Sequence, residues 1–505
     1  MITKNITLRL SILFSFLTVF AGRVFGVIFD FLVIRLFGAD KSGADAFFLS
    51  MGGLKLLRTA FSEGFLSSCA LPSLSKLFNH GEQERAVRLS TLLLLFFSMI
   101  IGLLAIAAFF FPSLVVNVFL PRVNPRLLST IYNYFPVFKL VLLFFIAAQV
   151  LFITLRANKR TFVPVFEYGF SYIVMLISLY FFASYKVDLS NLGFTMVTAE
   201  AGCFIIAVIL AISNGVLPKN PFFKETFLDA LEIAKKYLPL ALGYFSTYLF
   251  FGTQSVVSQH FNPGEIALLH FVYKIYHMPL YAFNMTINQI LLPSFSQSTG
   301  DAPSKKLRFL FFNGVKAILI AVPAIILFSF YFSANTFAFF LNKDTADQDV
   351  ITCMKLFTAL TLSLLFTSLT YLNNALCYSL RNTNIPAFAT SATSAIKILL
   401  MIPLVSYMGI FGVIASDLVA SFLTYIFTCI KIYTKFGITI PAKKTLIFTS
   451  KVFLKIALVI GLSSFIGTEL AARGIANSDI LIKTTLFALL FLIFKYKLNM
   501  KGYFI

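Results

Sequence analysis

Apolar runs of about twenty residues recur along the whole chain, with short polar connections between them. A run of this length spans the hydrocarbon core of a bilayer when it forms a helix. Of the 505 residues, 59% are hydrophobic and only 12% are charged, against about 25% charged residues in an ordinary soluble domain. The sequence therefore predicts a polytopic membrane protein with almost no soluble domain.

These runs predict about fourteen transmembrane helices. Backbone groups in lipid must be hydrogen-bonded within the spanning element, and such long runs suit helices better than the short alternating strands of a barrel. The predicted fold class is therefore all-α. The expected spans are residues 8–37, 44–69, 88–111, 133–157, 163–183, 192–213, 234–258, 265–297, 309–332, 355–380, 385–408, 411–433, 447–467 and 479–497.

The positive charges between the spans predict the orientation of the chain. One alternate set of loops carries clusters of Lys and Arg at residues 156–160, 305–308 and 443–444, whereas the opposite loops carry few. Cytoplasmic loops are enriched in these residues, so both termini are expected in the cytoplasm. The formal net charge of +21 is dispersed over such loops, and topology and anionic lipid explain it better than a nucleic-acid partner.

A short internal repeat predicts two halves of the same orientation. The segment "LPSLSK" at Leu71 recurs as "LPSFSQ" at Leu292, each at the expected cytoplasmic end of an even-numbered span. A parallel repeat of this kind is typical of transporters with two six-helix lobes around a central cavity. The expected lobes are residues 1–218 and 219–435, and residues 436–505 hold two further helices.

Positively charged side chains within the spans are the first candidates for a site. A cation at the centre of a membrane helix costs about 2.5 to 3.5 kcal/mol, so several are tolerated only where a cavity or a partner compensates. The alternative is that each one reaches an interface or pairs locally, as Arg23 with Asp30 or Arg58 with Glu63. The candidate substrate-binding cations are Arg23, Lys55, Arg58 and Lys274.

A polar stripe in the eighth span is the second candidate feature. Its members follow spacings of four, three, four, three and four residues, so they share one side of a helix that Pro279 is expected to kink. Together with the cations, such a stripe suggests a water-filled cavity for an anionic substrate, and guanidinium groups suit phosphate oxygens. The stripe consists of His270, Lys274, His277, Tyr281, Asn284 and Asn288.

The sequence contains no constellation typical of an enzyme. It has no P-loop, no HExxH motif and no acid pair beside a nucleophile, so we expect no catalytic residue, no ATP use and no cofactor. The cysteines lack CxxC spacing and histidine partners, so neither a metal site nor a disulfide framework is expected. They are interpreted as small packing residues: Cys69, Cys203, Cys353, Cys377 and Cys429.

The segments "GRVFGVIFD", "RLFGADKSGADAFFLS", "LLRTAFSEGF" and "LPSLSK" resemble the N-terminal signature of the MurJ (MviN) family of lipid II flippases. This family belongs to the MATE-like multidrug/oligosaccharidyl-lipid/polysaccharide exporter superfamily. The resemblance covers residues 22–76 and extends to "YKIYHMPLYAFNMTINQILLPSFSQ" in the eighth span. It implies movement of lipid II, an undecaprenyl-diphosphate-linked glycopeptide, from the cytoplasmic to the periplasmic leaflet of the bacterial inner membrane. It also implies a central cationic cavity and a groove for the lipid tail at the last two helices.

The resemblance assigns roles to particular residues. Arg23 and Arg58 match the cavity arginines of the first two spans, and Glu63 matches the glutamate that follows. Asp45 matches the acid before the "AFF" run. The acids Asp30, Asp45 and Glu63 are therefore expected as cavity or gating groups.

The chain departs from the family pattern at several positions. Lys274 stands where the family usually has an arginine, and Phe29 and Thr59 stand where many members have further arginines. Lys55 lies one turn from Arg58 and supplies a replacement charge. Some relatives resemble sodium-coupled transporters with carboxylates in spans 7 and 11. Here neither span contains Asp or Glu and span 11 contains Lys397, so no sodium site is expected there.

Other functions remain open at this point. A flippase for another polyprenyl-diphosphate glycan or a MATE-type exporter would share the fold, although an exporter of cationic drugs would need acids in its cavity. A non-transporting membrane scaffold would have no use for retained cations. The expected partners are lipid II, membrane lipids and proteins of cell-wall synthesis or division, with no nucleic acid.

Overall fold

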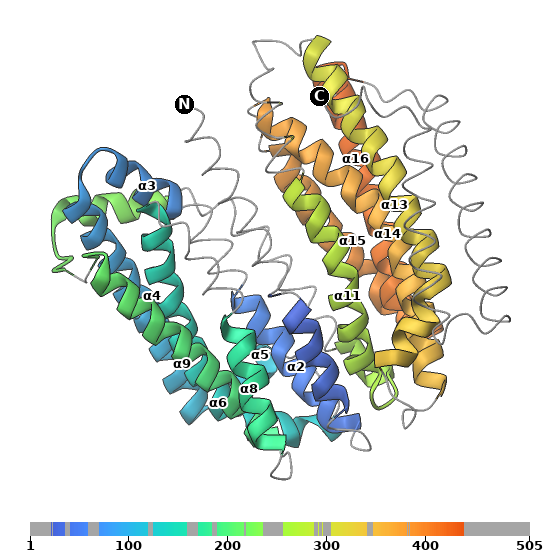
Figure 1. Cartoon of the computed structure of the whole chain (residues 1–505), viewed down its shortest axis with the longest axis horizontal. Coiled ribbons are helices and arrows are strands. Elements are labelled where there is room, and N and C mark those ends of the chain that lie inside the picture. The colour runs from blue at the N-terminus through green and yellow to red at the C-terminus, as the bar shows by residue number, and fades with distance from the viewer. Residues whose placement is uncertain are drawn as a thin grey trace, which may run out of the picture. The chain divides into compact units, whose positions relative to one another are not determined.

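The computed structural model describes residues 22, 24–35, 41–58, 70–119, 125–158, 170–183, 189–216, 219–235, 256–286, 291, 295, 305–340, 347–380, 382 and 384–438. These residues form helices and connections, and none of them forms a strand (Figure 1). The predicted all-α fold class is therefore confirmed. The expected spans at 447–467 and 479–497, and nearly all of that at 234–258, lie outside the described residues.

The chain divides into two compact units, Met1–Phe271 and Val272–Ile505. The division falls within one helix, α11 (Glu265–Thr286). The predicted lobe boundaries after residues 218 and 435 remain a prediction.

In the first unit, α6 is the central helix, because α2, α3, α4, α5 and α9 all pack against it. One apolar core joins α3, α4 and α6 through Leu74, Leu89 and Ile153, each fully buried. The helices of this unit are α2 (Lys41–Arg58), α3 (Leu71–Asn79), α4 (Gln83–Phe110), α5 (Pro112–Phe119), α6 (Pro125–Ala157), α8 (Ser171–Ala183) and α9 (Leu189–Ser213), with unlabelled helical segments at 24–35 and 224–235.

In the second unit, α14 packs against α13 on one side and against α16 on another, and α15 packs mainly on α16. These long helices lie alongside one another (Figure 1). The helices that follow α11 in this unit are α13 (Lys305–Phe340), α14 (Asp347–Ser379), α15 (Asn384–Met408) and α16 (Ile410–Phe436).

α15 and α16 form a tight helical hairpin. Gly409 makes the turn with a φ of +57°, a left-handed conformation that favours glycine because it has no Cβ. Three residues later, Gly412 lies directly on the backbone of Leu404 and Val405, which a Cβ at this position would overlap. Small residues let membrane helices approach closely, so Gly412 sets the spacing of the hairpin.

Six helices among the described residues are long and apolar enough to cross a membrane. Their outer surfaces carry large exposed apolar side chains, such as Leu399 and Ile209, that a soluble protein would bury. Because lipid is the solvent that such surfaces match, the chain is a multi-pass membrane protein, as predicted.

The structure adds helices that hydropathy alone did not predict. α5 lies between the third and fourth expected spans, and residues 224–235 are already helical although the seventh span was expected to begin at 234. Residues 224–235 contain five charged side chains, so their mean hydropathy is too low for a membrane span. α13 and α14 likewise extend beyond the expected spans, because a helix can continue past the apolar run that identifies it.

Candidate functional site

The beginning of α11 is fixed by a carboxylate from another helix. The first backbone N–H groups of a helix have no partner within it. Asp45 of α2 accepts the N–H of Gly264 at 2.6 Å and the N–H of Ala267 at 2.9 Å, and the residue is only 2% exposed. A buried negative charge is also stabilised by the positive end of the helix dipole. Asp45 therefore holds α11 in position, and its predicted gating role remains a prediction.

Aromatic and apolar contacts complete this junction. The His270 imidazole is stacked on the Phe48 ring with a centroid distance of 5.8 Å, and Ala267 belongs to the same core as Phe29 and Phe47. Phe29 is 1% exposed and lies 6.5 Å from Phe47 between ring centroids. The position where the family resemblance implies an arginine in many members is therefore an apolar core position in this chain.

The predicted acid of the first span lies beside this core. Asp30 follows Phe29 in the helical segment 24–35 and is 7% exposed. A buried carboxylate requires hydrogen bonds or an opposite charge, and Asp30 is not without a partner. Its predicted role beside the cavity cations remains a prediction.

The rest of α11 carries the predicted polar stripe. Lys274 and His277 are both half-buried, and His277 Nδ1 lies 2.6 Å from the carbonyl oxygen of Tyr273. Tyr281 and Asn284 lie in the same helix, but their side chains are outside the described part, as is the whole of Asn288. The helix contains Pro279, as expected.

The structure does not place the other predicted charged side chains of the first two spans. Arg23 and Glu63 lie outside the described residues. Lys55 and Arg58 lie in the last turns of α2, but their side chains also lie outside. The convergence of these cations with Lys274 therefore remains a prediction.

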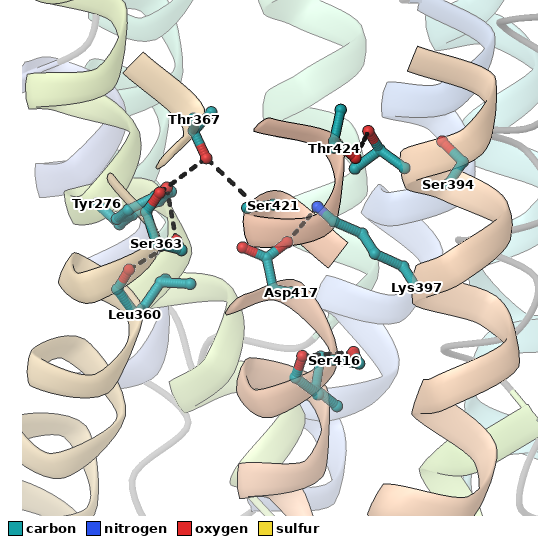
Figure 2. Close-up of polar contacts among 12 residues, drawn as sticks. Tyr276, Leu360, Ser363, Thr367, Ser394, Lys397, Ser416, Asp417, Ser421 and Thr424 are labelled. Atoms are coloured by element: carbon teal, nitrogen blue, oxygen red, sulfur yellow. Dashed lines mark hydrogen bonds and ion pairs between the residues drawn. The ribbon is translucent and has the colours of Figure 1, made fainter. Parts of the chain in front are cut away.

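The second unit contains a set of polar contacts between helices that the sequence analysis did not predict, here called the polar seam, and Figure 2 shows part of it. It joins four helices. On α16 its members are spaced four, three and four residues apart, so they share one face. The polar seam consists of Tyr276 of α11, Ser363, Thr367 and Asn373 of α14, Thr393 and Lys397 of α15, and Asp417, Ser421, Thr424 and Thr428 of α16.

Hydrogen bonds connect α11 to α16 through α14. The hydroxyl of Ser363 donates to the carbonyl of Leu360 at 2.7 Å, so its oxygen accepts from the Tyr276 hydroxyl at 2.9 Å. The Thr367 hydroxyl lies 3.3 Å from Ser421 Oγ. Figure 2 shows Thr367 between Tyr276 and Ser421, so the three helices are linked at one level.

The strongest interaction of the polar seam is an ion pair across the α15–α16 hairpin. Lys397 Nζ contacts Asp417 Oδ1, with the two side chains 21% and 6% exposed. Farther from the turn at Gly409, the hydroxyl oxygens of Thr393 and Thr424 are 2.7 Å apart. A charge in a membrane span is tolerated when it has such a partner.

A sequence signal for this pair existed. Lys397 is the only charged residue of α15, and Asp417 is the only acid of α16. In an antiparallel hairpin that turns at Gly409, they are offset by about one helical turn, close enough for a lysine side chain to reach across. Reading each span separately concealed this relation.

A third group of charges joins residues 219–235 to the start of α4. Arg85 binds the carboxylate of Asp229 through Nε at 2.8 Å and Nη2 at 2.9 Å, and this bond raises the pKa of Arg85. Arg88 lies 3.0 Å from Glu84, and Lys219 lies 3.4 Å from the same carboxylate. Both cations lower the pKa of Glu84, and Arg88 has the larger effect.

The described residues contain no group of three or more His, Cys, Asp or Glu side chains arranged to hold a metal ion. Four cysteines are free thiols in that part of the chain: Cys203, Cys353, Cys377 and Cys429.

The fold defines the class: a polytopic, all-helical membrane protein with buried polar groups between its helices. The sequence profile described as Lipid II flippase MurJ matches residues 33–484. The chain belongs to the lipid II flippase MurJ family, as the N-terminal segments predicted.

Individual relatives agree with this assignment. The chain is 22% identical over 436 residues to the probable lipid II flippase MurJ of Thermotoga maritima, covering 83% of this chain and 84% of the relative. It is 24% identical over 461 residues to the lipid II flippase MurJ of Thermosipho africanus, covering 89% and 88%.

Solved structures agree on the fold. A lipid II flippase MurJ in an inward closed conformation superposes with a TM-score of 0.77 at 20% identity, covering 96% of this chain and 98% of the other. A MATE family multidrug transporter in an inward-facing conformation superposes with a TM-score of 0.65 at 13% identity, covering 82% and 94%. The family names indicate a transporter and not an enzyme.

Proposed function

We propose that this chain is a lipid II flippase of the bacterial cytoplasmic membrane. It moves the undecaprenyl-diphosphate-linked disaccharide-pentapeptide from the cytoplasmic to the periplasmic leaflet. The observation that carries this proposal is the family match over residues 33–484, which includes nearly all of the predicted spans. Both termini lie in the cytoplasm in this proposal, in accordance with the distribution of Lys and Arg among the loops.

The transport mechanism in this proposal is alternating access between the two lobes. Arg23, Arg58 and Lys274 bind the diphosphate, with Lys55 as a further cation. Guanidinium groups bind phosphate oxygens through paired hydrogen bonds, and Lys274 contributes a point charge. Asp30 and Glu63 pair with these cations in the empty state and are displaced by the diphosphate. This difference between the two states would link substrate binding to the conformational change.

Two described features support a central role for α11 in this mechanism. Asp45 fixes the beginning of the helix through two backbone N–H groups. Tyr276, two residues after Lys274, is hydrogen-bonded into the polar seam. A binding group on a helix that is held at two levels is well preorganised for its ligand. The lipid tail lies at residues 436–505 in this proposal, and proteins of cell-wall synthesis or division are further partners.

Complementation tests this proposal. A bacterium depleted of its own flippase would be supplied with the wild-type chain, Arg23→Ala, Arg58→Ala or the control Lys431→Ala, a change at an exposed position of α16. We expect growth with the wild type and the control, and loss of growth with both arginine variants at equal membrane abundance. Growth with both arginine variants would refute the cation mechanism. Failure of the wild type would instead favour another glycan, a MATE-type exporter or a scaffold.

A direct assay separates these cases. Vesicles with the purified chain and labelled lipid II would be assayed for exposure of the label at the opposite leaflet. Movement of lipid II by the wild type, reduced in Arg58→Ala, would support the proposed function. Absence of movement by the wild type would overturn it.

A further inference from the structure

Residues 219–235 have no role in the proposed transport mechanism, yet they are firmly attached to the first unit. Thr226 and Ile233 are each 1% exposed. Ile233 packs in one core with Leu89 of α4 and Ala157, the last residue of α6. The inner face of this segment is therefore packed into the core of the first unit, against α4 and α6.

Polar contacts hold the same face. Asp229 receives the two hydrogen bonds from Arg85, and the backbone N–H of Lys219 donates to Thr91 Oγ1 at 3.1 Å. The Arg88 guanidinium lies 3.8 Å from the centroid of the Phe223 ring. These contacts fix the rotation of the helical segment about its own axis.

The outer face is apolar and uncovered in this chain. Phe222, Phe227, Leu228 and Leu231 are 69%, 51%, 56% and 52% exposed. Phe227 and Leu231 are four residues apart, and Leu228 lies beside them on the same side of the helix. Large apolar side chains exposed together in this way indicate an interaction surface.

Charge is distributed around the helix in an ordered manner. Lys224 and Lys235 fall on the same stripe as Leu228 and Leu231, at intervals of four, three and four residues. The acids Glu225, Asp229 and Glu232 form a separate stripe. Asp229 of this stripe accepts the hydrogen bonds from Arg85. The exposed lysines therefore lie within the apolar surface, and the glutamates lie away from it. Lys224 and Lys235 stand at the two ends of the apolar stripe, from which long lysine side chains can cover apolar surface with their stems and reach lipid phosphates at a membrane interface.

The position along the chain favours lipid over a protein as the occupant. The core that contains Ile233 also contains Ala157, where the candidate span Leu140–Ala157 ends. The segment thus lies at the depth where a membrane-crossing helix leaves the hydrocarbon.

We propose that residues 222–235 are an in-plane membrane anchor. Phe222, Phe227, Leu228 and Leu231 enter the boundary between headgroups and acyl chains, and Lys224 and Lys235 bind the phosphates of anionic lipids. In the topology proposed above, the leaflet is the cytoplasmic one. The anchor would keep the start of α4 at a fixed depth in the membrane through the Arg85–Asp229 bond.

The chain contains no tryptophan, so a single introduced one reports its own surroundings. The full chain with Leu228→Trp would be compared with Glu232→Trp, at an exposed position of the acidic stripe, in vesicles of phosphatidylcholine and phosphatidylglycerol. We expect brominated lipid to quench Leu228→Trp at least about twofold more strongly than Glu232→Trp, and iodide in the buffer to do the reverse. Equal quenching of the two variants, or strong iodide quenching of Leu228→Trp, would overturn the proposal. That result would hold whether or not a protein partner covers this face in cells.

The role of the lysines is tested in the same background. Adding phosphatidylglycerol to phosphatidylcholine vesicles should increase the brominated-lipid quenching of Leu228→Trp, and Lys224→Gln with Lys235→Gln should remove this increase. An increase that persists without the lysines would refute the phosphate contacts. Circular dichroism and the melting temperature would verify that each variant is folded. Loss of lipid II transport in Arg58→Ala, with unchanged quenching, would separate this proposal from the proposed function.

Discussion

The Lys397–Asp417 ion pair allows a quantitative test of what holds α15 to α16. Lys397→Met removes the cation and leaves a carboxylate whose side chain is 6% exposed. Breaking a buried ion pair by removing one partner costs about 3 to 5 kcal/mol, because the remaining charge is uncompensated. Asp417→Asn should lower the free energy of unfolding by less than Lys397→Met, near the lower end of this range. The Lys397 side chain that it leaves unpaired is 21% exposed, so part of its charge reaches a polar environment.

The double variant is the decisive measurement. Replacing both partners removes both charges, and such replacements are often neutral in buried pairs. We expect Lys397→Met with Asp417→Asn to unfold within about 1 kcal/mol of the wild type, which gives a coupling energy of several kcal/mol between the two positions.

The assay is reversible unfolding in detergent, followed by circular dichroism over increasing sodium dodecyl sulfate. Lys431→Met is the matched control, because Lys431 is an exposed lysine on the same hairpin. Its free energy of unfolding should change by less than about 0.5 kcal/mol. Additive losses in the double variant would show that the two charges act independently and would refute the reasoning.

Three further predictions concern single positions. Gly412→Ala should destabilise the chain by up to about 3 kcal/mol, because the new Cβ overlaps the backbone of Leu404, whereas Gly102→Ala, in open space inside α4, should not destabilise it in the same unfolding assay. Asp45→Asn should cost about 1.5 to 3 kcal/mol, because one amide oxygen replaces the two charged acceptors at the start of α11, and an unchanged melting temperature would contradict the capping role. Because Arg88 and Lys219 lower the pKa of Glu84 below 4.5, its ion pairs stabilise the fold above that pH and are lost as the pH falls through the lowered pKa. The melting temperatures of wild type and Glu84→Gln should therefore differ near neutral pH and converge in acid.

Hydropathy predicted the fold class and most of the spans, because the length of an apolar run is a direct requirement of the bilayer. α11 was found for the same reason, and its polar spacing made Lys274 and His277 candidate site residues, a role that remains a prediction. The structure places both on that helix, half-buried.

Most of the polar seam was not predicted, because hydroxyl groups hardly lower the hydropathy of a span. Thr424 and Thr428 count as ordinary residues in an apolar run until their partners on other helices are known. The family resemblance singled out Asp45 as a gating acid, but its contact with the start of α11 was not predicted, because its partners are backbone N–H groups more than two hundred positions later in the chain.

The helical segment 224–235 was missed for the opposite reason. Its charged residues lower the mean hydropathy, although their arrangement around the helix leaves a clear apolar face. Periodicity at 3.6 residues per turn detects such a segment where average hydropathy does not.

The contact of Gly412 with the backbone of Leu404 and Val405 has a mechanical consequence. Two helices joined by a single-residue turn, in backbone contact beside that turn and linked by an ion pair further along, have no freedom to slide past each other. Whatever motion carries a lipid headgroup through the membrane, α15 and α16 must travel as one rod, and the bending must occur at other joints. Spin labels on these two helices should therefore keep one distance through the entire transport cycle.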